Sequence, residues 1–225
     1  MSTTSDTSII PPVAFPTNWT LANLQEHLGG IPFERIRLYP PPGMATEEDA
    51  LWLDDHEDCI CELVDGVLVE KVMSTFESLL AATLIRLIGS FLDANDLGIL
   101  LGADGQLRIL PTKMRVPDVA FIRWDRFPGG KLPKDRVYKL APDLAVEILS
   151  EGNTQQEMAN KLAEYFQAGT RLVWTIDPRT RSANIYTSPD EVAAIDENGF
   201  LAGGDVLPGF QVRLGEIFDR TERRQ

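Results

Sequence analysis

Two carboxylates in apolar surroundings are the residues of this chain best suited to chemistry. Asp118 begins an apolar stretch after Pro117, and Glu147 lies inside the run LAVEIL, residues 144–149. A buried acid is costly unless it is paired, hydrogen-bonded or bound to a metal ion. Two such acids on neighbouring strands could chelate Mg²⁺ or Mn²⁺, with the carbonyl of Ile148 as a further oxygen ligand. A cation held there would lower the pKa of a bound water and polarise a phosphodiester.

A lysine completes this candidate site. Lys161 belongs to the helix predicted directly after the Glu147 strand, where Lys161, Glu164 and Tyr165 share one face at spacings of three and four. Its ammonium could orient an attacking water and stabilise negative charge on a phosphate. Two alternatives remain open: Glu147 could form a salt bridge with a buried base, and Lys161 could be an ordinary exposed lysine.

The pattern of apolar residues predicts the elements that would position these side chains. Two apolar runs around Asp65-Gly66 indicate a hairpin, and residues 75–95 have the apolar spacing of a long helix. Further strands are expected at 98–101, 106–110, 118–122, 144–149, 171–176 and 182–186, and further helices at 154–168 and 214–218. This order predicts an α/β (mixed α+β) fold with one mixed β-sheet core flanked by helices.

The chain divides into three segments by composition. Residues 1–18 are rich in Ser, Thr and Pro and are predicted to be a disordered leader. Residues 19–57 are expected to form an N-terminal helical accessory segment, which leaves 58–225 as the main domain. Deleting Met1 to Asn18 should therefore leave the fold intact.

Composition restricts the function classes. Because the 225 residues contain only two histidines, His-based triads and His-rich metal sites are disfavoured. We find neither an apolar run of the roughly 18–20 residues that a membrane helix needs nor a secretion signal, so a cytoplasmic protein without membrane contact is expected.

The net charge of −13 is unusual for a nucleic-acid-binding protein, but it is unevenly distributed. The window 107–139 contains nine basic and three acidic residues, which makes it +6 and the rest of the chain −19. The basic residues could form a rim for a polyanion, with Arg115, Arg123, Lys131 and Lys134 holding a DNA backbone. An ordinary solvated loop is an equally good interpretation.

Five stretches of the sequence resemble a known family. They are CELVDGVLVEK (61–71), VPDVAFIRWDRFP (116–128), PDLAVEILSEGNT (142–154), KLAEYFQAGTRLVWTIDP (161–178) and LPGF (207–210). In order and spacing they resemble the large bacterial family named putative restriction endonucleases, a domain-of-unknown-function branch of the PD-(D/E)XK nuclease superfamily. The resemblance implies a restriction-endonuclease-like core with Asp118 and Glu147 as the motif carboxylates.

The chain departs from the simplest superfamily pattern. The lysine expected two residues after the glutamate is replaced by Leu149, and in this branch it has moved to the following helix, which implicates Lys161. Glu62 and Glu77 also match motif positions, so either could be an auxiliary acid. Ser78 stands where members often carry a histidine.

These observations predict a Mg²⁺- or Mn²⁺-dependent endonuclease that acts on DNA, and cleavage of two antiparallel strands favours a homodimer. Apolar residues of the C-terminal strands and tail could form its shared surface: Ile185, Tyr186, Phe200, Leu201 and Phe210. The main alternative is a catalytically inactive module that keeps the fold to bind nucleic acid or protein. A carboxylate-pair sugar hydrolase ranks third, because no aromatic-lined cleft is evident.

Overall fold

A mixed six-stranded sheet forms the centre of the computed structural model, which describes residues 12–221. The strand order is β11-β10-β9-β8-β7-β4, in which only the β8–β9 pair is parallel. The mixed sheet core is therefore confirmed. Its strands are β4 (Gly98–Leu101), β7 (Val119–Arg123), β8 (Leu144–Ile148), β9 (Leu172–Asp177), β10 (Ser182–Tyr186) and β11 (Val192–Ile195).

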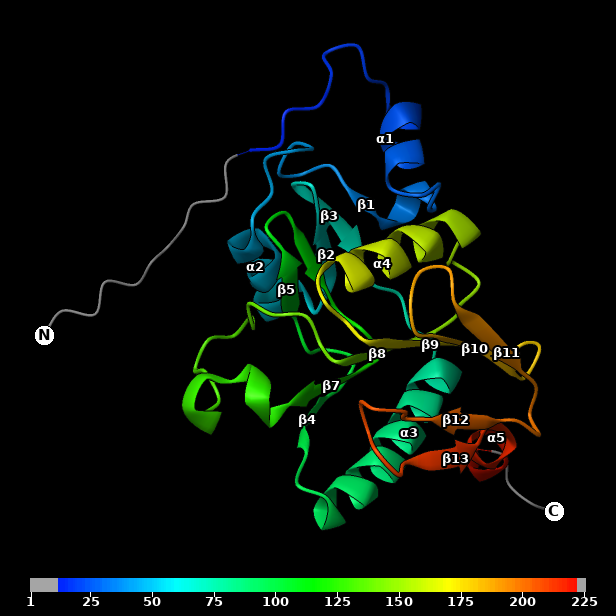
Figure 1. Ribbon diagram of the computed structural model, residues 1–225. Coiled ribbons are helices and arrows are strands. Elements are labelled where there is room, and N and C mark those ends of the chain that lie inside the picture. The colour runs from blue at the N-terminus through cyan, green and yellow to red at the C-terminus, as the bar shows by residue number, and fades with distance from the viewer. Residues whose placement is uncertain (1–11, 222–225) are drawn as a thin grey trace, which may run out of the picture.

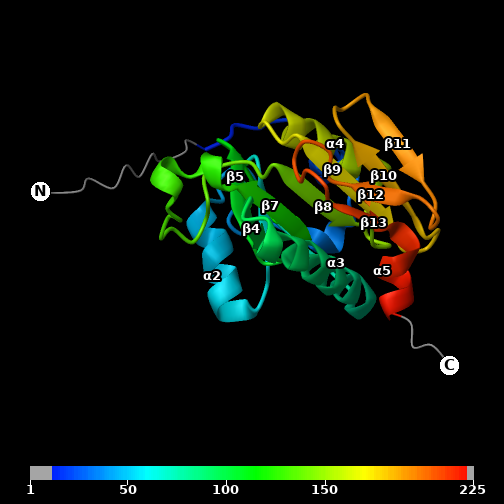
Figure 2. The ribbon, with the colours of Figure 1, turned by 60° about the horizontal axis from the view of Figure 1, so that its bottom comes forward.

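Helices cover both faces of this sheet. α4 (Gln155–Gln167) lies on one face, and α3 (Thr75–Ala94) and α5 (Leu214–Thr221) lie on the other, as Figures 1 and 2 show. Because side chains alternate along a strand, each central strand supplies two cores. Val146 and Trp174 pack in the cluster that contains α3 and α5, whereas Ala145 and Val173 pack with α4.

A second sheet holds the hairpin. It is antiparallel, with the order β1-β3-β2-β6-β5, and Asp65 and Gly66 turn between β2 and β3 with positive φ angles of 51° and 73°. The hairpin is thus confirmed, but the prediction of one sheet was wrong. The reason is that β6 joins β2 to β5 in a sheet of their own. The bounds are β1 (Ile36–Arg37), β2 (Cys61–Val64), β3 (Val67–Glu70), β5 (Leu107–Leu110) and β6 (Lys113–Arg115). Separately, β12 (Phe200–Ala202) pairs with β13 (Gln211–Arg213).

The N-terminal region is bound to the rest of the fold. Residues 1–11 lie outside the described part, but Val13 N–H donates to the Gly43 carbonyl at 2.9 Å and Phe15 stacks on Trp19. The predicted disordered leader therefore does not extend to Asn18, because these contacts hold its last residues. The segment 19–57 contains α1 (Leu21–His27), a 3₁₀ turn (Phe33–Arg35), β1 and α2 (Glu47–Glu57), and its strand β1 is part of the second sheet.

Within the described residues, α3 is long and apolar enough to cross a membrane by length and composition. A core helix passes the same test, and Leu80, Leu84 and Ile88 of α3 are fully buried against the sheet. The finding is weak evidence for a membrane span.

Candidate active site

Asp118 and Glu147 lie on the same face of the six-stranded sheet. β7 and β8 are antiparallel, with Val119 opposite Val146 and Ala120 opposite Ala145. Asp118 directly precedes β7, and its N–H donates to the Val146 carbonyl at 3.0 Å, beside Glu147. Because side chains alternate along a strand, Asp118 shares the face of Ala120 and Glu147 shares that of Ala145. Ala120 and Ala145, the next residues of this face, pack with α4, so the two acids also point to the α4 side.

The Asp118 carboxylate is buried and held at both oxygens. Oδ2 accepts a hydrogen bond from Ile148 N–H at 2.6 Å, and Oδ1 forms an ion pair with Lys71 Nζ at 2.9 Å. Lys71 Nζ also donates to the Val116 carbonyl at 2.6 Å. Sequence analysis missed Lys71 because it ends a strand motif with no local sign of its partner.

The Glu147 carboxylate is held by two residues of α4. Tyr165 O–H donates to Oε1 at 2.6 Å, and Lys161 Nζ lies 3.4 Å from Oε2. Lys161 and Tyr165 are four residues apart and thus adjacent on one face of the helix. The N-cap Thr154, whose hydroxyl accepts from Glu157 N–H, sets where that helix begins. Glu147 and Lys161 are therefore in contact, while a single pocket shared by Asp118, Glu147 and Lys161 stays a prediction.

Glu62 of β2 extends the cluster. Its Oε1 lies 3.0 Å from Lys161 Nζ and its Oε2 lies 2.7 Å from Arg115 Nη1. Arg115 in turn pairs with Glu164 of α4. Acids and bases therefore alternate through the interior from Glu147 to Glu164, and each buried charge has a partner of opposite sign.

The electrostatic environment differs between the two glutamates. Burial raises the pKa of Glu147, and the nearby acids Asp118 and Glu62 add to the rise while Lys161 opposes it. Burial also acts to raise the pKa of Glu62, but Lys161 and Arg115 outweigh it and hold that pKa below its ordinary value. Glu62 is therefore a firmly ionised partner of the two bases, whereas Glu147 binds a proton more readily.

The two bonding partners of Glu147 keep their protons. Burial acts to lower the pKa of Lys161, yet Glu147 and Glu62 outweigh it and raise the pKa. Burial, Glu147 and Glu62 all raise the pKa of Tyr165 well above that of an ordinary phenol. Both groups therefore act as donors to Glu147.

Glu77 lies apart from this cluster. Its Oε2 accepts from Ser74 N–H at 2.7 Å, and Ser74 caps α3 in return, so the carboxylate is used in a capping box. Glu77 also lines a cavity of about 440 Å³ together with Leu149 and Ser150, which follow β8. Of the two auxiliary acids considered, Glu62 contacts the site lysine, whereas Glu77 borders a separate cavity just past the end of the strand that carries Glu147.

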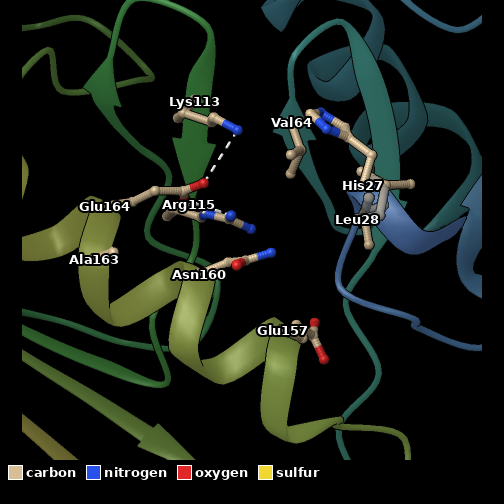
Figure 3. Close-up of a pocket in the computed structure, with 10 residues that line it drawn as sticks. His27, Leu28, Val64, Lys113, Arg115, Glu157, Asn160, Ala163 and Glu164 are labelled. Atoms are coloured by element: carbon tan, nitrogen blue, oxygen red, sulfur yellow. Dashed lines mark hydrogen bonds and ion pairs between the residues drawn. The ribbon is translucent and has the colours of Figure 1, made fainter. Parts of the chain in front are cut away.

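The bases of the window 107–139 form only part of the expected rim, because four of the nine are exposed, namely Lys131, Lys134, Arg136 and Lys139. Arg115 is 4% exposed, and with Lys113 it lines a cavity of about 310 Å³ between α4, the hairpin and α1 (Figure 3), where Glu164 pairs with both. A DNA-backbone role for Arg115 is therefore wrong, because its guanidinium is buried among carboxylates. Lys131 and Lys134 are exposed, as the prediction requires.

The carboxylates of Asp118 and Glu147 are suitable ligands for a hard divalent cation, although each already forms an ion pair with a lysine. Asp118 and Glu147 offer carboxylate oxygens, which Mg²⁺ and Mn²⁺ prefer. Each of these two carboxylates has a lysine partner, and within residues 12–221 no group of three or more His, Cys, Asp or Glu side chains is arranged to hold a metal ion. The backbone N–H of Ile148 donates a hydrogen bond to Asp118. That the Ile148 carbonyl is a metal ligand stays a prediction.

Comparison with known proteins agrees with this architecture. A structure described as a "putative nuclease belonging to DUF820" from Anabaena variabilis is similar, with a TM-score of 0.64 and 19% identity over 71% of this chain and 90% of that one. At this identity the likeness shows the fold. No curated protein matches the chain. The family model Uma2, described as "Putative restriction endonuclease", matches residues 47–215, which include the whole cluster around Asp118 and Glu147. The chain therefore belongs to the Uma2 family of putative restriction endonucleases.

Proposed function

We propose that this protein is a metal-dependent endonuclease that hydrolyses phosphodiester bonds of DNA. The supporting observation is that the acids of two separate motifs, Asp118 and Glu147, lie side by side at the end of the β7–β8 ladder, with Lys161 Nζ 3.4 Å from Glu147. Membership of a family of putative restriction endonucleases supports the same reaction class.

In this proposal Asp118 and Glu147 would hold Mg²⁺ or Mn²⁺, which supplies an activated water and offsets charge on the phosphate. The Ile148 amide and the Tyr165 hydroxyl orient the two carboxylates by hydrogen bonds at 2.6 Å. Lys161 would orient the attacking water and stabilise the phosphate, and Glu62 keeps that lysine protonated. Glu77 is the second candidate for an auxiliary acid.

DNA would be held by exposed bases of the loop after β7. Lys131 and Lys134 are exposed there, whereas Arg123 Nε forms an ion pair with Asp125 Oδ2 at 3.2 Å. Because phosphate contacts release counterions, binding should weaken steeply as salt rises. Replacing both lysines with Met should lower affinity for DNA and leave the rate at saturating DNA nearly unchanged.

A homodimer would present two such sites to antiparallel strands, and we propose this assembly as well. Leu201 and Phe210 pack in the core of the protomer, but Phe200 is 48% exposed and Ile185 and Tyr186 are partly buried. A monomeric mass by light scattering at micromolar concentration would contradict the dimer and would leave the chemistry untouched.

A second candidate function has an observation in its favour. As whole residues, Asp118 and Glu147 are only 3% and 5% exposed, and each forms an ion pair with a lysine. Buried carboxylates that are already paired are consistent with a module that keeps the fold and binds nucleic acid or protein without hydrolysis.

A plasmid-nicking assay with Mg²⁺ and Mn²⁺ titrations separates these functions. Asp118→Asn and Glu147→Gln keep the size of each side chain and remove its charge, so both should abolish metal-dependent nicking. Lys161→Met should reduce it. Asp93→Asn, an exposed position on α3, is the matched control and should behave as wild type. Equal residual nicking by wild type and Asp118→Asn would mean contamination, and the binding module would then be the better account.

A further inference from the structure

Lys71 pairs with Oδ1 of Asp118, the carboxylate oxygen that does not accept the backbone hydrogen bond from Ile148. The Ile148 amide bonds to Oδ2, and the Lys71 ammonium lies 2.9 Å from Oδ1. The Val116 carbonyl, 2.6 Å from Nζ, holds the ammonium from a second side. A divalent cation at Oδ1 would meet this positive charge at close range, where repulsion is strong.

Lys71 also lies at the boundary between Asp118 and solvent. It lines a cavity of about 200 Å³ with Ile60, Met73, Ala103 and Asp104. Its side chain is 10% exposed, against 5% for Asp118 and 4% for Lys161. The Lys71 ammonium could therefore move outward on its own flexible stem, while Lys161 is enclosed between two glutamates.

The wall of this cavity offers the ammonium another partner. Asp104 is exposed there and carries a carboxylate of the same chemistry as Asp118. The Lys71 backbone is fixed by its N–H bond to the Ile60 carbonyl at 2.8 Å, so the side chain can swing without moving β3.

We propose that Lys71 is a counter-ion gate: its ammonium holds the Asp118 oxygen at which a divalent cation binds, and it must move into the adjoining cavity before the cation enters. The gate rests on the proposed function in one respect, that Asp118 is a metal ligand. In the metal-free protein the Lys71 ammonium therefore blocks Asp118. The protein binds a divalent cation more weakly than Asp118 and Glu147 would without Lys71.

Calorimetric titration of the full chain with Mn²⁺ tests the gate without measuring cleavage. Removing the competing ammonium in Lys71→Met should tighten Mn²⁺ binding by about tenfold or more, as expected when a hydrogen-bonded charge no longer has to be displaced. Lys71→Gln, which is neutral but can still bond to Val116, should tighten it too, so a folding defect in one variant does not decide the result. Lys71→Arg, which keeps the charge, should bind as wild type does.

Two further variants make the result specific. Arg86→Met removes an equal charge from an exposed position on α3 and should change affinity by less than about twofold, because exposed charges are screened. Asp118→Asn in the Lys71→Met background should abolish the gain. A gain that survives Asp118→Asn, or neutral Lys71 variants that bind no tighter than wild type, would overturn the gate. In the second case wild-type Mn²⁺ binding leaves the nuclease proposal standing, whereas absence of binding in every variant rejects both.

Discussion

The two faces of the six-stranded sheet are built from the same strands but bury different kinds of side chain. Toward α3 and α5 the strands project hydrocarbon and aromatic groups such as Val146, Ile148 and Trp174. Toward α4 they project small apolar residues together with Asp118 and Glu147, and helix and hairpin supply the matching bases. One face is filled by apolar packing, and the other combines an apolar cluster with paired charges.

The difference indicates what each face is for. Well-packed apolar residues often stabilise a fold as well as, or better than, a buried ion pair of the same volume. The α3 face shows that this chain can fill the space beside β8 with apolar groups. The buried charges of the α4 face are therefore better explained by a role in ligand binding or chemistry than by a need for stability.

The largest effect on stability should come from the apolar face. Trp174 is fully buried and stacks on Phe210 with ring centroids 6.2 Å apart. Trp174→Ala should lower the free energy of unfolding by about 3–5 kcal/mol, measured by urea denaturation. Trp174→Phe should cost less, because the indole Nε1 has no hydrogen-bond partner among residues 12–221 and its loss breaks no bond. Equal costs for the two variants would contradict the packing account of this face.

On the charged face, Lys161→Met should lower the free energy of unfolding by about 3 kcal/mol, the low end for breaking a buried pair, because Arg115 still neutralises Glu62. The double variant Lys161→Met, Glu147→Gln should regain part of that loss, since it no longer leaves Glu147 charged and unpaired. Denaturation of both variants at neutral pH measures the difference. A double variant less stable than Lys161→Met would show that the two side chains are not coupled as the structure indicates.

The smallest effect concerns an ion pair beside the site. Burial acts to raise the pKa of Glu157, but Arg35, bonded to both carboxylate oxygens at 2.8 and 3.0 Å, outweighs it, and the pKa is lowered. A lowered pKa in the folded state means that the pair stabilises above the unfolded value of about 4.3 and that this contribution is lost as the pH falls below it. Glu157→Gln should therefore flatten the fall in stability between about pH 5 and pH 3. An unchanged slope would contradict the assignment.

The sequence predicted the parts of the fold that have strong local patterns. The apolar run around Glu147 and the helix that bears Lys161 were both identified, because burial and helical spacing are visible over short stretches. β6 (Lys113–Arg115) was missed, since three residues with two charges do not resemble a strand. The placement of the hairpin in a second sheet depends on β6 and could not be seen without it.

The candidate site was predictable where a residue's own surroundings define it, and not where a distant partner does. Lys71 meets an acid on another strand, far along the chain, and no local pattern marks that contact. Arg115 resembled a surface base until the fold enclosed it between Glu62 and Glu164. The use of Glu77 in a cap was readable, because Ser74 three residues before it forms the capping-box pattern.

The central claim is that the charged face of the sheet holds a divalent cation between its two acids. A crystal structure of the protein grown with Mn²⁺, with anomalous diffraction recorded to locate the ion, tests this most directly. The account predicts an anomalous peak in contact with the carboxylates of Asp118 and Glu147, with the Lys71 ammonium moved away from Asp118. A peak only elsewhere on the molecule, or the Lys71–Asp118 pair intact at saturating Mn²⁺, would contradict it.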